Sequence, residues 1–84
     1  MYDIEWTDKA LRQTRKIKDR AVRAKIFDSV INLENFPNVS NVVKLKNRSD
    51  YRLRVGRWRI LFTAEHVFKI IDVQEVKIRN EDTY

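Results

Sequence analysis

Side-chain character alternates with period two on both sides of one glycine in residues 51–62, which read YRLRVGRWRILF. Such alternation is typical of half-buried β-strands. Gly56 followed by Arg57 suits a two-residue type II′ turn, because the first turn position needs a positive φ. A hairpin is therefore predicted, and its register places Arg54 directly opposite Arg59.

One face of this hairpin is apolar and the other is basic. The apolar face is expected to join the core and carries Tyr51, Leu53, Val55, Trp58, Ile60 and Phe62. The other face carries Arg52, Arg54 and Arg59, with Arg57 at the turn. Like charges paired across two strands cost up to ~1 kcal/mol, so the basic face makes most sense if an anion lies between its arginines. Arginine suits phosphate because its planar fork donates two parallel hydrogen bonds; the alternative is a solvated outer face.

An αα-hairpin is predicted before this segment. Residues 2–6 alternate as a strand, and apolar side chains then recur at helical spacing over residues 8–18. Thr7 or Asp8 can act as the N-cap of that helix. A second helix with an apolar stripe is predicted over residues 20–35, which completes the hairpin.

Charge on the helices is expected to be balanced. The outer side of the first helix is basic and carries Lys9, Arg12, Arg15, Lys16 and Lys18. Asp19 is a plausible N-cap of the second helix. Together with Asp28 and Glu34 it is also expected to offset these cations, so the interpretation is a solvated helix face. Pro37 should end the hairpin, with Phe36 before it in an extended conformation.

A short strand is predicted over residues 42–46, directly before the arginine hairpin. Its parity places Val43 and Leu45 inward and Lys44 and Lys46 outward. A turn over residues 47–50 connects it to the arginine hairpin.

The last strand is predicted over residues 67–76, where apolar side chains fall on both faces and indicate a central position. Residues 77–84 form a polar tail. The order is thus strand, two helices, and then a mostly antiparallel sheet of three or four strands that packs on the helices. This is an α+β fold in which the basic hairpin face is left open.

Length and composition narrow the class of protein. Residues 1–84 are expected to form one domain. The chain has no cysteine, which fits a reducing compartment. It has no long apolar run, and its first strand carries acids rather than the features of a signal peptide. A cytoplasmic protein without a membrane partner is expected.

The basic charge is concentrated in one segment. The formal net charge is +6, and residues 44–59 contain seven basic side chains and one acidic one. The rest of the chain therefore sums to zero. Such a concentration is typical of a surface that binds nucleic acid or another polyanion.

Few side chains of this chain are suited to catalysis. His66 is the single histidine and is expected in an exposed turn, and without cysteine a structural zinc site is excluded in practice. Gly56 alone cannot form a glycine-rich phosphate loop. The adjacent carboxylates of Glu81 and Asp82 cannot easily face each other as a catalytic pair. An enzyme would have to use arginine, lysine, tyrosine and glutamate.

That set suits RNA cleavage by attack of the 2′-hydroxyl on the adjacent phosphorus. Cations can orient the backbone and stabilise the charge that grows on the phosphorane. Proton transfer would be poor, because arginine titrates above ~12 and tyrosine and lysine titrate near ~10. A slow catalyst that relies on a larger partner to position its substrate is expected.

Four features together resemble one protein family over nearly the full length. They are the capped helical hairpin that ends in Phe36-Pro37, the VKLK segment at residues 43–46, the hairpin at 51–62, and the closing KIRNEDTY segment at 77–84. With these features the chain resembles a RelE/ParE-superfamily toxin of bacterial toxin–antitoxin systems. Its RelE-like members are mRNA interferases that cut messenger RNA in the ribosomal A site.

The resemblance implies a set of site residues and no metal or cofactor. The candidate catalytic residues are Arg54, Arg59, Arg79 and Tyr84. The candidate RNA-binding residues are Lys44, Lys46, Arg48, Arg52 and Arg57. In this reading Arg59 stabilises the transition state, and Tyr84 stacks on a base or assists proton transfer.

The resemblance also implies partners. These are a cognate antitoxin that masks the basic face, the ribosome and its mRNA, and operator DNA bound only by the toxin–antitoxin pair. The leading hypothesis is a ribosome-dependent endoribonuclease that inhibits translation. A ParE-like inhibitor of DNA gyrase and a catalytically silent module that binds nucleic acid or antitoxin are the alternatives. The basic sheet face favours the first, because gyrase poisoning does not require it.

Overall fold

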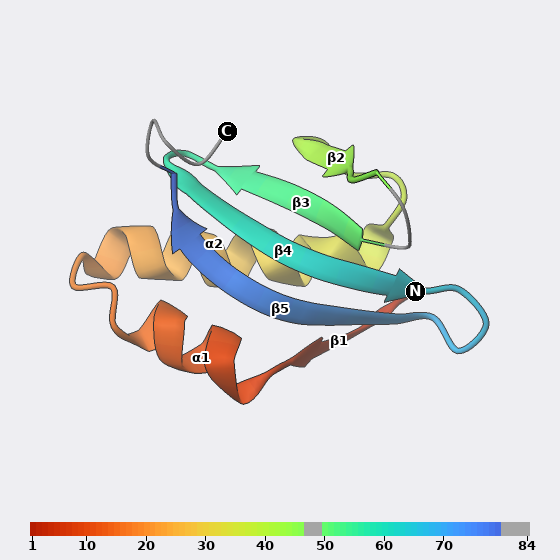
Figure 1. Ribbon diagram of the computed structural model, residues 1–84, viewed down its shortest axis with the longest axis horizontal. Coiled ribbons are helices and arrows are strands. Elements are labelled where there is room, and N and C mark those ends of the chain that lie inside the picture. The colour runs from red at the N-terminus through yellow and green to blue at the C-terminus, as the bar shows by residue number, and fades with distance from the viewer. Residues whose placement is uncertain (47–49, 80–84) are drawn as a thin grey trace.

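The computed structural model describes residues 1–46 and 50–79 (Figure 1). Its elements are β1 (Asp3–Trp6), α1 (Asp8–Arg15), α2 (Arg20–Ile31), the 3₁₀-helix η1 (Asn32–Asn35), β2 (Val42–Lys44), β3 (Asp50–Val55), β4 (Trp58–Glu65) and β5 (Ile70–Ile78). The strands form one sheet in the order β1-β5-β4-β3-β2. Only the β1–β5 pair is parallel. The predicted α+β fold, with β5 between two other strands, is confirmed.

The helical hairpin begins at the predicted caps. The Thr7 hydroxyl accepts a hydrogen bond from the Ala10 N–H at 3.1 Å, and the Asp19 carboxylate caps the first turn of α2. However, α1 ends at Arg15 rather than near residue 18. The reason is Ile17, which is buried at 7% exposure and whose N–H bonds to the Thr14 carbonyl instead of continuing the α-helical pattern.

The second helix is also shorter than predicted. It ends at Ile31 and continues as the tighter η1 to Asn35. Phe36 then has φ −50° and ψ 138°, the extended conformation expected of a residue before proline. The chain thus leaves the helical layer at the predicted place.

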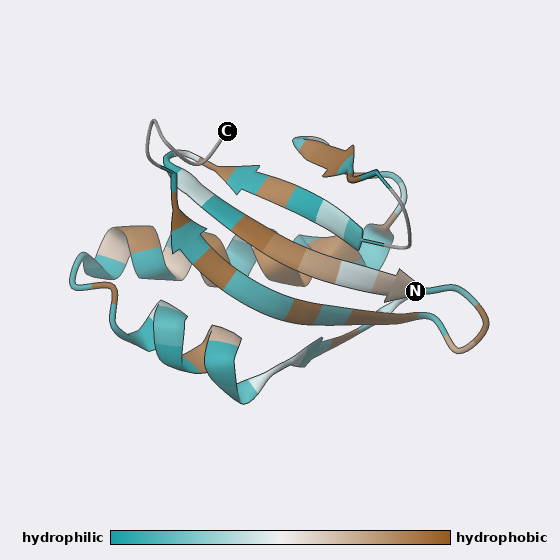
Figure 2. Cartoon of the chain, in the orientation of Figure 1, coloured by the Kyte–Doolittle hydropathy of each residue, from teal (hydrophilic) through white to brown (hydrophobic). Residues whose placement is uncertain are grey.

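The core lies between the helices and one face of the sheet. Apolar and polar bands alternate along β3 (Figure 2), as expected for a strand with one buried face. The buried core residues include Ile26, Val30, Leu33, Leu53, Ile60, Phe62, Ile71 and Val73. In residues 1–46 and 50–79 no helix covers the other sheet face, which is called the open face below (Figure 1).

The strand β5 contains a β-bulge, and the bulge shifts which of its side chains face the core. Leu61 pairs with Glu75, whereas its neighbour Phe62 pairs with Val73, so Gln74 is an extra residue. Val73 and Val76 therefore both face the core, although simple alternation would separate them. As a result, Glu75 and Lys77 lie on the open face, whereas uninterrupted alternation from Val73 would place them on the core face.

The predicted bounds of β5 were wrong at both ends. The carboxylate of Glu65 accepts hydrogen bonds from the N–H groups of Phe68 at 2.7 Å and Val67 at 3.0 Å. These bonds form a turn over residues 66–69 and lower the pKa of Glu65. The strand therefore begins at Ile70, and it runs to Ile78, two residues into the predicted tail.

The prediction of which β2 side chains face the core was also wrong. Val42 pairs with Leu53, Val43 with Arg52 and Lys44 with Tyr51. Val42 therefore packs against the core, and Val43 lies on the open face at 52% exposure.

Candidate nucleic-acid interface

Three cations lie next to one another across the open face. Arg54 of β3 is directly opposite Arg59 of β4, and Arg59 is directly opposite Lys77 of β5. The predicted hairpin register is confirmed, and Gly56 has the positive φ, 56°, that the predicted turn requires. The sheet thus holds three positive charges in one row, called the cation row below.

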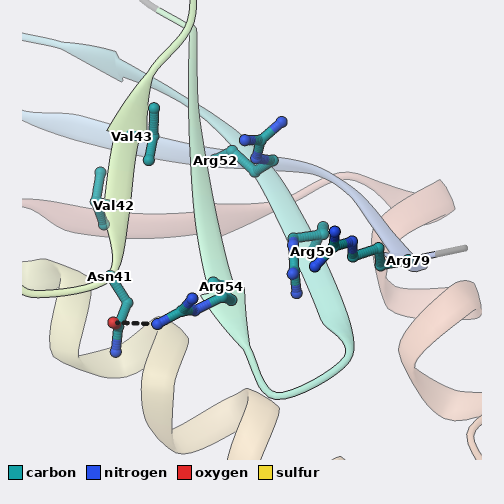
Figure 3. Close-up of a pocket in the computed structure, with 7 residues that line it drawn as sticks. All are labelled: Asn41, Val42, Val43, Arg52, Arg54, Arg59 and Arg79. Atoms are coloured by element: carbon teal, nitrogen blue, oxygen red, sulfur yellow. Dashed lines mark hydrogen bonds between the residues drawn. The ribbon is translucent and has the colours of Figure 1, made fainter. Parts of the chain in front are cut away.

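Four arginines surround a depression at this row. Its volume is about 440 Å³, and the described residues that line it are Asn41, Val42, Val43, Arg52, Arg54, Arg59 and Arg79 (Figure 3). None of these side chains is acidic. An anion in the depression would therefore meet guanidinium groups from β3, from β4 and from the residue after β5. The other lining groups are two valine side chains of β2 and the Asn41 amide before it.

Arg59 is held in place by the hairpin turn. Its Nη1 donates hydrogen bonds to the carbonyl oxygens of Gly56 at 2.8 Å and Trp58 at 3.0 Å. The side chain lies on the open face as predicted, but it is only 8% exposed. Both bonds use Nη1, and among the described residues no partner is bonded to the edge formed by Nε and Nη2, the edge that suits a bidentate contact with an anion.

Arg54 is positioned by Asn41. The backbone N–H of Arg54 donates to the Asn41 carbonyl at 2.9 Å, and its Nη2 donates to the Asn41 Oδ1 at 3.3 Å (Figure 3). Asn41 has φ 63°, a left-handed conformation that asparagine tolerates better than most residues. Asn41 therefore both turns the chain into β2 and holds the side chain of one arginine.

Arg79 reaches the depression from the end of β5. Its backbone N–H donates to the Arg57 carbonyl at 2.7 Å, which fastens the chain after β5 to the β3–β4 turn. Arg57 itself is exposed at that turn and is not among the described residues that line the depression.

The structure does not gather all the predicted site residues. Arg52, Arg54, Arg59 and Arg79 come together. Lys44 does not, because its pairing with Tyr51 places it on the helix-covered face, beside an aromatic groove that includes Tyr2 and Phe36. Lys46 is exposed after the end of β2. Arg48 and Tyr84 lie outside the described residues.

Sequence reasoning missed two residues of the interface. Lys77 was assigned to a polar tail, and only the bulge in β5 reveals that it faces Arg59. Asn41 precedes the strand predicted over residues 42–46 and was given no role in the site. The preference of asparagine for left-handed backbone was a usable signal for a turn there, but its contact with Arg54 was not visible in the sequence.

The open face is positive at one end and negative at the other. At the end opposite the cation row, Asp50 pairs with Thr63 and Thr63 with Asp72. Glu75 lies between the two ends and forms ion pairs with Lys9 at 3.0 Å and Lys77 at 3.7 Å. A polyanion bound on this face would therefore be attracted to the cation row and repelled from the Asp50 end.

His66 is in an exposed turn, as predicted, and its Nδ1 shares a hydrogen bond of 2.8 Å with the Tyr2 hydroxyl. Within residues 1–46 and 50–79 no group of histidine, aspartate and glutamate side chains could hold a metal ion. In the same residues no helix is long and apolar enough to cross a membrane.

Solved structures share this fold over almost the whole chain. The archaeal RelE–RelB complex from Pyrococcus horikoshii matches with a TM-score of 0.83 and 20% identity, over 95% of this chain and 97% of that chain. The intact RelBE toxin–antitoxin complex of Escherichia coli gives 0.78 and 18%, over 96% and 100%. A YoeB/ParE toxin from Agrobacterium tumefaciens gives 0.76 and 16%, over 95% and 100%.

Sequence comparison identifies the family. No curated protein matches the chain significantly. The family model described as the ParE toxin of the type II toxin–antitoxin system parDE matches residues 4–82. This match and the RelE-like fold agree with the resemblance found in the sequence. The chain therefore belongs to the ParE toxin family, within the RelE/ParE superfamily of toxins from type II toxin–antitoxin systems.

Proposed function

We propose that this toxin is a ribosome-dependent endoribonuclease that inhibits translation by cleaving mRNA. The observation that carries the proposal is the cation row with its depression, where four arginines meet and no lining side chain among the described residues is acidic. Attack of a 2′-hydroxyl on the adjacent phosphorus produces a phosphorane with added negative charge. A surface with fixed guanidinium groups is suited to stabilise that charge.

Arg59 is the proposed centre of catalysis. It is the least exposed of the four arginines, and its Nη1 is already bound to the turn. A fixed donor needs little reorganisation when charge develops, which is the main requirement for electrostatic stabilisation of a transition state. In this proposal its Nε and Nη2 contact two non-bridging oxygens of the phosphorane.

The neighbouring arginines are proposed to hold the RNA backbone. Arg54 and Arg79 flank Arg59, and Arg52 is farther along β3 on the same face. Contacts to successive phosphates would align the 2′-oxygen with the bond that breaks, and such alignment is worth several kcal/mol in well-positioned reactions. We further propose that Lys46, Arg48 and Arg57 extend this contact along the strand.

Proton transfer is the weak part of this mechanism. Arginine does not lose its proton in proteins and cannot act as a base. We propose that Tyr84 either stacks on a base next to the cleaved bond or assists proton transfer. A site of this composition should be slow on free RNA, so the ribosome is proposed to supply the alignment of its substrate.

A cognate antitoxin is the proposed partner. Two of the solved structures with this fold are complexes of a RelE toxin with a RelB antitoxin. A surface with four arginines would bind RNA without specificity, with an affinity that falls steeply as salt rises. We propose that an antitoxin segment with acidic side chains covers the cation row, that the pair binds operator DNA, and that both act in the cytoplasm.

A second function is favoured by the family match. The matching model is described as the ParE toxin, and a ParE-like inhibitor of DNA gyrase would act through protein contacts rather than through RNA cleavage. Induced expression separates the two functions. The endoribonuclease should arrest translation and leave cut mRNA, whereas a gyrase inhibitor should arrest replication and leave cleaved DNA. A chain that does neither but still binds RNA or antitoxin would be the catalytically silent module.

A further inference from the structure

A second concentration of positive charge lies in the helical layer. Residues 12–25 contain seven basic side chains and one acidic one, a net charge of +6. The apparent neutrality of the chain outside residues 44–59 arises because acidic residues elsewhere cancel this segment in the sum. The segment covers the end of α1, the connection and the start of α2.

Six of these cations are exposed on a well-supported backbone, and they are called the tip cations below. They are Arg12, Arg15, Lys16, Lys18, Arg20 and Lys25. The seventh, Arg23, is half-buried and donates from Nη1 to the Ile17 carbonyl at 2.6 Å. Ile17 is buried beneath the connection, and the fully buried Thr14 donates its hydroxyl to the Ala10 carbonyl at 2.9 Å. The backbone that carries the tip cations is thus anchored to the core of the protein.

The acidic side chains expected to balance these charges form no ion pairs with them in the described part of the chain. The Asp19 carboxylate is turned toward the backbone, where it accepts from the N–H groups of Ala21 at 2.9 Å and Val22 at 3.2 Å. Asp28 and Glu34 were expected to balance the helix cations. Yet no carboxylate within residues 1–46 or 50–79 lies at ion-pair distance from any tip cation. The tip cations are exposed, as a solvated helix face requires, but the predicted acidic partners Asp19, Asp28 and Glu34 form no ion pairs with them.

The tip and the cation row are separate surfaces. The helices cover one face of the sheet and the cation row lies on the other. Both are at the same end of the molecule, because the α1–α2 connection and the β3–β4 turn lie together opposite the β4–β5 turn (Figure 1). A strand bound in the arginine depression would have to pass around the edge of the sheet to reach the tip. A second stretch of polyanion is the simpler ligand.

We propose that the tip cations dock on the phosphate backbone of a double-stranded nucleic acid. Binders of single strands combine cations with exposed aromatic side chains on which bases stack. The segment 12–25 contains no aromatic residue. Cations on a projecting helical hairpin can instead contact the phosphates of a rigid duplex, which supply most non-specific affinity. This inference does not depend on cleavage at the cation row.

The test compares two triple variants of the full chain that have equal net charge. The first, Arg15→Gln/Lys18→Gln/Arg20→Gln, removes three tip cations; the second, Arg52→Gln/Arg54→Gln/Arg57→Gln, removes three cations of the hairpin. Affinity is measured against salt for duplexes of about 20 base pairs, one of DNA and one of 2′-O-methyl RNA, and for a single strand of the same length. The methyl group prevents attack by the 2′-oxygen, so binding is measured without cleavage. Thermal unfolding checks that both variants fold.

The tip variant should lose duplex affinity by at least about tenfold at 0.1 M salt. Its salt dependence should become shallower by about 0.9 for each lost phosphate contact. The hairpin variant should lose mainly single-strand affinity. A larger loss on DNA or on RNA would tell which duplex the tip prefers, and either would support the proposal.

Three results would overturn the proposal. The first is duplex binding by the tip variant equal to that of the parent. The second is equal losses by both variants on every ligand, because net charge alone would then explain binding. The third is loss of binding to vesicles of anionic phospholipid with duplex binding unchanged, because the partner would then be a membrane surface.

Discussion

Arg54 and Arg59 face each other directly across β3 and β4, and no carboxylate in the described residues lies at ion-pair distance from either. Lys77 extends the same row. Like charges at such positions destabilise a strand pair by a few tenths to ~1 kcal/mol. The fold tolerates this cost because the opposite face of the same strands is a well-buried core. An anion that binds between the two arginines would relieve the repulsion, and this makes the pair suited to a phosphate.

Arg59→Ala should abolish growth arrest and leave the fold intact. Its side chain lies on the open face, so the change leaves the core untouched. The two lost hydrogen bonds to turn carbonyls should cost about 1 kcal/mol, partly offset by the loss of repulsion from Arg54 and Lys77. Arg54→Ala should act in the same direction but less severely. The measurement is growth and mRNA integrity after induction, beside thermal unfolding of the purified variants.

Arg59→Lys is the matched control, because it keeps the charge but loses the planar fork. It should fold as the parent does and recover little activity. Full toxicity of a folded Arg59→Ala protein would remove the cation row from the mechanism.

Arg52→Ala should weaken RNA cleavage more than Lys44→Ala. Each substitution removes one positive charge, so the two variants have the same net charge. Arg52 lines the depression, whereas Lys44 pairs with Tyr51 on the opposite face. Single-turnover cleavage on stalled ribosomes measures the difference. If Lys44→Ala is the more damaging change, the position of β2 in the active toxin differs from the one described here.

The sequence predicted the hairpin register because three independent signals agreed there. Period-two alternation, a single glycine and the parity of the arginines all required the same pairing, and the structure has it from Asp50 to Val55. The helix caps were predicted for a similar reason, since Thr7 and Asp19 each precede an apolar helical pattern.

The faces of side chains were predicted wrongly in the strands whose register depends on tertiary structure. β2 has only 3 residues, which is too few for the alternation of apolar and polar side chains to define its register. The register follows instead from Asn41 and its bonds to Arg54. In β5 the bulge at Gln74 reverses the alternation, so the sequence pattern did not predict that Lys77 lies opposite Arg59. The basic side of the first helix was recognised in the sequence, but summing charge over the chain made it look balanced, because acids elsewhere cancel charges that they do not contact. Arg48 and Tyr84 lie outside the described residues, so their roles stay predictions.

Trp58→Ala should reduce stability but not RNA cleavage at low temperature. Trp58 lies on the core face, opposite in direction to its neighbour Arg59, so the prediction that it packs rather than stacks on bases agrees with its position. It is half-buried, so truncation should cost about 1–3 kcal/mol, less than the ~3–5 kcal/mol of a fully buried aromatic residue. Phe62→Ala is the comparison, because Phe62 is 1% exposed and should reach that larger value. Urea unfolding gives both free energies; an inactive Trp58→Ala protein of parental stability would show that Trp58 contacts RNA.

Gly56→Ala should destabilise the hairpin by about 1 kcal/mol. Apart from Gly56 and its two chain neighbours, no heavy atom of the described residues lies within 4 Å of the position that a Cβ would take, so the cost comes from the positive φ of 56° rather than from a clash. The Gly56 carbonyl also holds Arg59, so a distorted turn should lower cleavage activity together with stability. Arg57→Ala, at the next turn position, is the control and should change stability by less than ~0.5 kcal/mol. Equal stability of the two variants would show that the turn does not need glycine.

Glu75→Gln should remove stability near neutral pH and have little effect in acid. The ammonium of Lys9, and to a lesser degree Lys77, lowers the pKa of Glu75 below its ordinary value of 4.5. A carboxylate whose pKa is lower in the folded state stabilises the protein above its unfolded pKa, and this contribution disappears as pH falls through the folded value. Because the pair is partly exposed, the contribution should be under ~1 kcal/mol, or up to roughly 5 °C in Tm for a domain of this size. Unfolding curves of parent and variant should therefore differ at about pH 7 and converge at about pH 3. Lys9→Gln should behave in the same way, and a constant difference at every pH would mean that Glu75 acts through packing in the bulge of β5 rather than through its charge.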